Sequence, residues 1–110
     1  MIKCYLEDRT LLVEILSAEL DHHIAREVRE DVDDILFKKQ VNYIIFDFKY
    51  VNFMDSSGIG VIIGRYKKIV NHGGKVSVIN MKPRVEKVFN LSGMNKIIDI
   101  YETFEDAINS

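Results

Sequence analysis

Side chains that could do chemistry gather in one short stretch of the sequence, FMDSSGIG at residues 53–60. Two adjacent serines follow an aspartate and precede a glycine, where an apolar run gives way to a helical pattern. Asp and Ser are preferred helix N-caps, because their oxygens accept the free N–H groups of the first turn. Asp55 or Ser56 is therefore expected to start a helix, and this structural role does not exclude a functional role for the same residue.

The glycines of this stretch lack the spacing of a dinucleotide-binding loop. Gly58, Gly60 and Gly64 follow the pattern G-x-G-x-x-x-G, whereas a pyrophosphate is held at a helix N-terminus by G-x-G-x-x-G. The chain also has no G-x-x-x-x-G-K-[ST] phosphate loop. Helix N-termini attract anions in general, but this pattern predicts no dedicated nucleotide site and no cofactor.

A serine nucleophile is a second chemistry that these residues could support. Neither Ser56 nor Ser57 lies in a G-x-S-x-G elbow. His22 and His23 are candidate general bases, because their turn is expected at the same edge of the sheet. Exposed polar residues are the simpler interpretation of both histidines. A small enzyme that hydrolyses esters or nucleotides with Ser56 stays as the alternative, and we assign no catalytic residue.

A serine at an exposed helix start is also accessible to a protein kinase. A phosphate there adds a charge of about −1.5 to −2 at neutral pH. The helix dipole tolerates negative charge at an N-terminus, so the fold is expected to survive while the surface changes sign. A partner docked on this loop would meet steric overlap and, if acidic there, repulsion. Regulated modification of Ser56 is thus a third interpretation.

The hydrophobic pattern predicts the elements that position this loop. Short apolar or alternating runs indicate strands at residues 2–7, 11–16, 41–48, 75–79 and 97–101. Apolar residues at helical spacing indicate helices that begin near Asp21, Ser57, Pro83 and Thr103. The order ββαβαβαβα predicts an α/β fold, with a mixed, mostly parallel sheet, an N-terminal hairpin and about four helices. Functional loops of such sheets follow the carboxyl ends of the strands, where FMDSSGIG and residues 18–23 both lie.

Length, composition and charge argue against several classes of function. The 110 residues suit a single domain spanning 1–110, and 47% of them are hydrophobic. A net charge of −2 argues against nucleic-acid binding. Two clusters, residues 21–23 and 31–34, contain ligand types without recognised metal spacing, so no metal site is predicted. Without a signal peptide or an apolar run of membrane-spanning length, we expect a soluble cytoplasmic protein with no membrane partner.

Three segments together resemble a known family. MDSSGIGVIIGRYK at residues 54–67 is similar to the signature of STAS-domain anti-sigma factor antagonists, in particular those of early sporulation. AELDHH at residues 18–23 resembles the family's turn before the first helix, and FNLSGMNKII at residues 89–98 resembles its third-helix ending. The matches occur in order and span nearly the whole chain. The first of the two serines, Ser56, corresponds to the family's phosphorylation site.

The resemblance implies a protein–protein switch rather than an enzyme. The unphosphorylated protein would bind an anti-sigma factor that is also a serine kinase and so free the sigma factor. The kinase would phosphorylate Ser56 with ATP, and a PP2C-like phosphatase would restore the binding form. The implied partner-binding residues are Asp21, Asp55, Ser56, Ser57, Gly58 and Ile59. Arg65, Lys67 and Lys68 would lie near the docking face.

One position departs from the family's pattern. Ala18 stands where the family often has glycine, which reaches conformations that alanine resists, so the backbone there is expected to differ slightly. A STAS module of a stress-signalling pathway is a further alternative. The segments at 18–23 and 53–58 favour sporulation.

Overall fold

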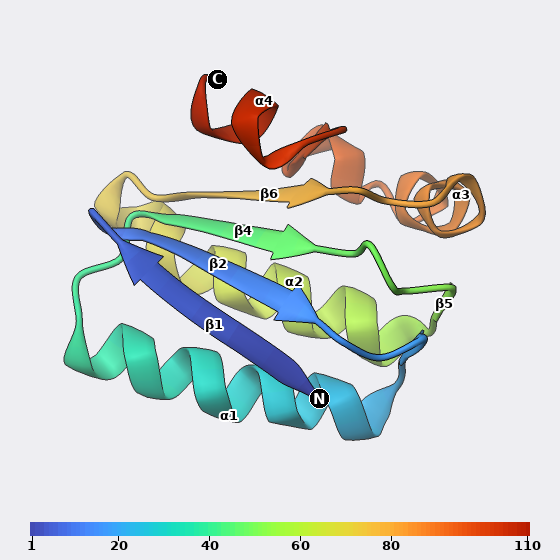
Figure 1. Ribbon diagram of the computed structural model, residues 1–110, viewed down its shortest axis with the longest axis horizontal. Helices are drawn as coiled ribbons and strands as arrows, with labels where there is room; N and C mark the ends of the chain where they lie inside the picture. The colour runs from blue at the N-terminus through green and yellow to red at the C-terminus, as the bar shows by residue number, and fades with distance from the viewer.

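A five-stranded sheet forms the centre of the computed structural model, which describes residues 1–110 (Figure 1). Its strands lie in the order β1-β2-β4-β6-β7, and only the hairpin between β1 and β2 is antiparallel. The strands are β1 (Ile2–Glu7), β2 (Thr10–Ile15), β4 (Tyr43–Asp47), β6 (Lys75–Ile79) and β7 (Asp99–Tyr101). The predicted α/β class with a mixed, mostly parallel sheet and an N-terminal hairpin is confirmed.

Four α-helices surround this sheet, as predicted. Helices α1 (His22–Lys38) and α2 (Ser56–Ile69) pack side by side on one face, and the short α4 (Phe104–Ile108) lies over the other (Figure 1). Helix α3 (Pro83–Leu91) lies beyond the carboxyl ends of the parallel strands (Figure 1). Two 3-10 turns, η1 (Val70–His72) and η2 (Met94–Lys96), follow α2 and α3. None of these helices has both the length and the apolar character needed to cross a membrane.

The core follows from the strand register. Leu11, Ile44 and Val76 are aligned across three neighbouring strands, and Val13, Phe46 and Val78 form the next row. All six are at most 2% exposed, because α1 and α2 cover this face. Burial of such continuous apolar rows is the main favourable term in folding. Cys4 is half-buried against this core, in agreement with its interpretation as a small hydrophobic residue.

A second, two-stranded sheet was not among the predicted elements. Its strands, β3 (Glu19–Leu20) and β5 (Phe53–Met54), pair in parallel at the carboxyl end of the main sheet. Two residues are too few to show a period in the sequence. The last predicted strand also begins later than expected, because Gly93 has φ +83 and leads into η2 before β7 starts at Asp99.

Candidate functional site: two adjacent helix N-termini

The small sheet brings the two candidate loops together. Leu20 of β3 pairs with Met54 of β5, and each is followed by an aspartate that caps a helix. Asp21 and Asp55 therefore occupy equivalent positions on neighbouring parallel segments. The N-termini of α1 and α2 start from the same end of the molecule (Figure 1). The predicted proximity of residues 18–23 to the DSSG stretch is thus a consequence of strand pairing.

The two caps use the same hydrogen bonds. Asp21 Oδ1 accepts hydrogen bonds from the amides of His23 and Ile24, both at 3.1 Å. Asp55 Oδ1 accepts from the amides of Ser57 and Gly58, at 2.8 and 3.4 Å. Each carboxylate satisfies amides that have no partner within the helix and places negative charge at the positive end of the dipole. Asp55, rather than Ser56, is the cap of α2.

Backbone contacts hold the loops in register. The carbonyl of Ala18 accepts hydrogen bonds from the amides of Asn52 and Phe53, at 2.7 and 3.2 Å. The carbonyl of Leu20 accepts from the amide of Asp55 at 3.4 Å. Ala18 does not adopt a positive φ, so alanine fits this position without strain. The turn before α1 therefore keeps its contact with the DSSG loop despite the departure at this position.

Asp21 is held in its ionised form. The hydrogen bond from the amide of Ile24 is the largest cause of a lowered pKa of the Asp21 carboxyl, and the amide of His23 and the charges of His23 and His22 act in the same direction. Desolvation acts against them. The result is a stable negative charge beside the DSSG loop at neutral pH.

The four residues after Asp55 differ in their access to solvent. Ser56, the first residue of α2, is exposed, and Ser57 is half-buried. Gly58 is buried, and Ile59 is half-buried against the core. Because the Asp55 carboxylate accepts the amide hydrogens, the Ser56 hydroxyl is not needed for the cap and is exposed to solvent. Ser56 is thus the more accessible of the two serines.

Gly58 contacts the small sheet directly. A Cβ atom at this position would lie 2.5 Å from Met54 Cγ and 2.8 Å from Leu20 Cγ. Both neighbours are buried residues of β3 and β5. Gly58 therefore lets the first turn of α2 approach the sheet closely and shapes the loop from within.

The other sequence candidates fit a catalytic centre poorly. The rings of His22 and His23 lie with their centroids 4.0 Å apart at the start of α1. The cap hydrogen bonds of the loop involve Asp21 and Asp55, and neither imidazole takes part in them through its ring. No three His, Cys, Asp or Glu side chains come close enough together to hold a metal ion.

Arg65 differs from its predicted place near the docking face. It is only 5% exposed, and its Nε lies 3.1 Å from Asp33 Oδ1 of α1. The pair is close but lacks hydrogen-bond alignment, and Arg65 Nη1 is buried without a partner. Burial lowers the pKa of the Arg65 guanidinium from its ordinary value, while Asp33 opposes this shift. Arg65 thus joins α1 to α2 and does not present its charge to a partner. Lys67 and Lys68 are exposed on the C-terminal half of α2.

Exposed apolar side chains near the loop were missed by the sequence analysis. Phe53 of β5, just before the DSSG residues, is 52% exposed, and Leu91 of α3 is 80% exposed. Helix α3 packs against β5, so both belong to the same end of the molecule. From the sequence, an apolar residue at the end of an apolar run is expected to be buried. Phe53 is identified as a surface residue only by its position on the exposed edge of the small sheet.

Comparisons with known proteins agree with this geometry. The STAS domain family matches residues 5–107. An anti-sigma F factor antagonist of Paenibacillus polymyxa is 41% identical over 100 residues, which are 91% of this chain and 86% of the relative. The solved structure of the anti-sigma factor antagonist SpoIIAA in its unphosphorylated form has a TM-score of 0.86 at 32% identity, covering 99% of this chain and 94% of that one. The phosphorylated form of the Bacillus cell fate determinant SpoIIAA has a TM-score of 0.76 at 31% identity, covering 99% and 97%.

Proposed function

The chain belongs to the STAS domain family as an anti-sigma factor antagonist, and from this membership we propose that phosphorylation of Ser56 switches its binding to an anti-sigma factor. In the unphosphorylated form, the loop with Asp55, Ser56, Ser57, Gly58 and Ile59 and the neighbouring Asp21 bind the anti-sigma factor. This contact releases the sigma factor. The family consists of regulators, so the chain is not an enzyme, and the alternative of Ser56 as a hydrolytic nucleophile is set aside.

The proposed cycle needs two partners. The anti-sigma factor is itself a serine kinase, which transfers the γ-phosphoryl group of ATP to the Ser56 hydroxyl. A PP2C-like phosphatase hydrolyses the phosphoserine and restores the binding form. The identity to an antagonist of an anti-sigma F factor supports a sporulation pathway in the cytoplasm rather than a stress pathway.

The observation that carries this proposal is the exposure of Ser56 at the first position of α2, beside the Asp21 cap of α1. A kinase must reach the hydroxyl, and Ser56 is exposed whereas Ser57 is half-buried. The cap of α2 is the Asp55 side chain, so modification of Ser56 does not remove it. The residue can therefore change charge without loss of the helix start.

Electrostatics explain how a phosphate on Ser56 weakens binding. The group adds a charge of about −1.5 to −2 next to the carboxylate of Asp55 and near that of Asp21. The dipole of α2 offsets part of this charge, so the protein itself tolerates it. A partner that packs closely on the loop meets added volume and concentrated negative charge. Binding is lost at the surface while the fold remains.

The two solved SpoIIAA forms support the claim that the fold remains after phosphorylation. The unphosphorylated and the phosphorylated form of that protein both match the present fold over 99% of its length. Phosphorylation of that relative is thus compatible with the same architecture. A local change of the binding surface is the mechanism that fits a preserved fold.

Calorimetric titration of the cognate anti-sigma factor tests the switch. We expect Ser56→Ala to bind about as tightly as the unmodified protein, because it keeps the Asp55 cap and adds no charge. Ser56→Asp is expected to bind at least about tenfold more weakly, which corresponds to about 1.4 kcal/mol. Asn71→Asp, which adds the same charge at an exposed position beyond the end of α2, is the matched control and should leave binding unchanged. Equal affinity of Ser56→Asp and the unmodified protein would contradict the charge mechanism.

A further inference from the structure

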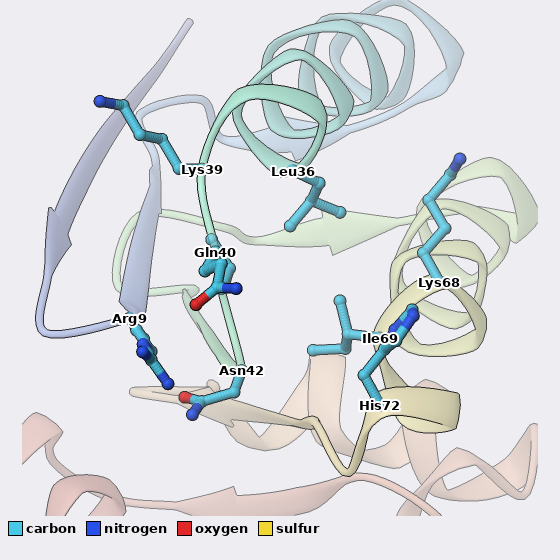
Figure 2. A pocket seen from close by; sticks show the side chains of 9 residues that line it. Arg9, Leu36, Lys39, Gln40, Asn42, Lys68, Ile69 and His72 are labelled. Atoms are coloured by element: carbon cyan, nitrogen blue, oxygen red, sulfur yellow. The ribbon is translucent and has the colours of Figure 1, made fainter.

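A cavity of about 420 Å³ lies at the opposite end of the molecule from the DSSG loop. Its walls come from the turn between β1 and β2, the segment between α1 and β4, and the end of α2 with η1 (Figure 2). These are the amino ends of the parallel strands β4 and β6, whereas Ser56 and Asp21 follow the carboxyl ends of β5 and β3. The cavity is therefore separate from the proposed switch.

Its polar lining is entirely basic or neutral. Arg9, Lys39 and Lys68 contribute cationic side chains, His72 contributes an imidazole, and Gln40 and Asn42 contribute amides. No aspartate or glutamate lines the cavity. The first 55 residues supply part of this lining, and they hold 12 acidic and 7 basic side chains. A lining without acidic residues is therefore not what the composition of this half would predict. Such an arrangement favours an anion.

Lys68 has an acidic neighbour outside the cavity, and that neighbour does not neutralise the cluster. The Lys68 ammonium lies 3.8 Å from Asp33 Oδ2, while Arg65 lies closer, at 3.1 Å from Oδ1. One carboxylate thus faces two cations, and Arg65 is the more buried partner. Lys39 and Lys68 extend from the rim of the cavity, and their ammonium groups point away from its interior (Figure 2). Each lysine must change its side-chain rotamer to contact a bound group.

Arg9 occupies an unusual backbone conformation. Asp8 and Arg9 form the two-residue turn of the hairpin with φ +49 and +67, a region that favours glycine. The carbonyl of Arg9 accepts hydrogen bonds from the amides of Asn42 and Tyr43, at 2.9 and 3.3 Å. These bonds fix the backbone of Arg9 at the edge of the cavity, and its side chain lies beside that of Asn42 (Figure 2). An arginine stands where glycine would be less strained, which is expected if its side chain has a role.

The remaining lining is apolar. Leu36, Val41 and Ile69 line the cavity beside the polar groups. The volume lies within the usual range of small-molecule pockets, about 300–1,000 Å³. We propose that this cavity binds a small organic phosphate monoester, with its dianionic phosphate on Arg9 and the rim lysines and its apolar part against Leu36, Val41 and Ile69. The planar guanidinium of arginine matches phosphate oxygens in pairs.

Titration with phenyl phosphate, followed by amide chemical shifts in low-salt buffer, tests this site. Saturable shifts are expected for residues around Arg9, residues 39–42 and residues 68–72, and not for the DSSG loop. Inorganic phosphate, which lacks the apolar part, is expected to bind more weakly at the same residues. Benzoate, which has the ring but a single negative charge, is expected to bind more weakly as well.

Arg9→Gly is the decisive variant, because glycine accepts φ +67 and the melting temperature should stay equal or rise. Its affinity for phenyl phosphate should fall at least tenfold. Arg84→Ala removes the same charge from an exposed position on α3 and should leave binding unchanged. Equal binding by Arg9→Gly, equal binding of benzoate, or shifts scattered over other lysine-bearing surfaces would overturn the proposal.

Discussion

Gly58 lies at the contact between the first turn of α2 and the small sheet, and this contact explains why a glycine follows the two serines. A Cβ would come within 3.0 Å of atoms of both Met54 and Leu20. The same sheet sets Asp21 beside Asp55. The DSSG stretch therefore combines a cap, an exposed hydroxyl and a close packing contact in four consecutive residues.

Gly58→Ala is expected to lower the free energy of unfolding by about 1–3 kcal/mol, because the buried neighbours must shift. Gly60→Ala, two residues further along α2, is the matched control. A Cβ at Gly60 meets nothing within 4 Å. Alanine there should raise stability by up to about 1 kcal/mol through its helix propensity. Urea denaturation of both variants measures the difference, and similar effects of the two substitutions would contradict the packing role of Gly58.

The pH dependence of α1 follows from its cap. The pKa of Asp21 is lowered in the folded protein, so its stabilising effect is present above the ordinary aspartate pKa and is lost as pH falls through the lowered value. The amide resonances of His23 and Ile24 should report this loss at acid pH. Asp21→Asn keeps a good N-cap without a titrating group and should remove the transition. An unchanged transition in Asp21→Asn would assign it to another group.

At the scale of elements, the contact between α1 and α2 includes a buried charge. Arg65 of α2 is 5% exposed and its side chain faces Asp33 of α1. The family resemblance implied that Arg65 lies near the docking face, and an arginine in an amphipathic helix usually faces solvent. Only the packing of the two helices shows that residue 65 falls on the shared face. Three buried polar atoms of this contact, Asp33 Oδ1, Arg65 Nε and Arg65 Nη1, make no hydrogen bond. Removal of either charge from the pair is therefore expected to destabilise the protein.

Asp33→Asn should therefore destabilise the protein by about 1–3 kcal/mol, since it leaves the buried guanidinium without a counter-charge. Asp34→Asn is the matched control, because Asp34 pairs with Lys38 on the exposed side of the same helix. Exposed pairs of this kind contribute no more than about 0.5 kcal/mol. Thermal unfolding compares the two variants, and equal effects would show that the Arg65 contact adds nothing.

The main elements were predictable because their signals are local. The β-branched runs, the caps at Asp21 and Thr103 and the stop at Gly93 each leave a pattern within a few residues. The strands β3 and β5 leave no such signal, since two residues form a strand only when a partner lies alongside. The same reason hid the surface position of Phe53. Proximity of Asp21 to the DSSG loop came from the topology rule for parallel sheets.

At the scale of the whole molecule, the two ends of the sheet differ in chemistry. The end with the DSSG loop carries the two capping aspartates and exposed apolar side chains, and the opposite end carries the basic cavity. Helices α1 and α2 begin at the first end and finish at the second (Figure 1). Phosphorylation at the first end should leave the sheet and its core unchanged, because Ser56 is exposed and lies outside the core.

The measurement that tests the central claim most directly is the intact mass of the protein after incubation with ATP and the cognate anti-sigma kinase, followed by peptide mapping. We expect one added phosphate on Ser56, only when the kinase is present. Ser57→Ala should be phosphorylated like the unmodified protein, whereas Ser56→Ala should gain no phosphate. No added phosphate with a kinase of proven activity, or a phosphate on Ser57 instead of Ser56, would contradict the proposed switch.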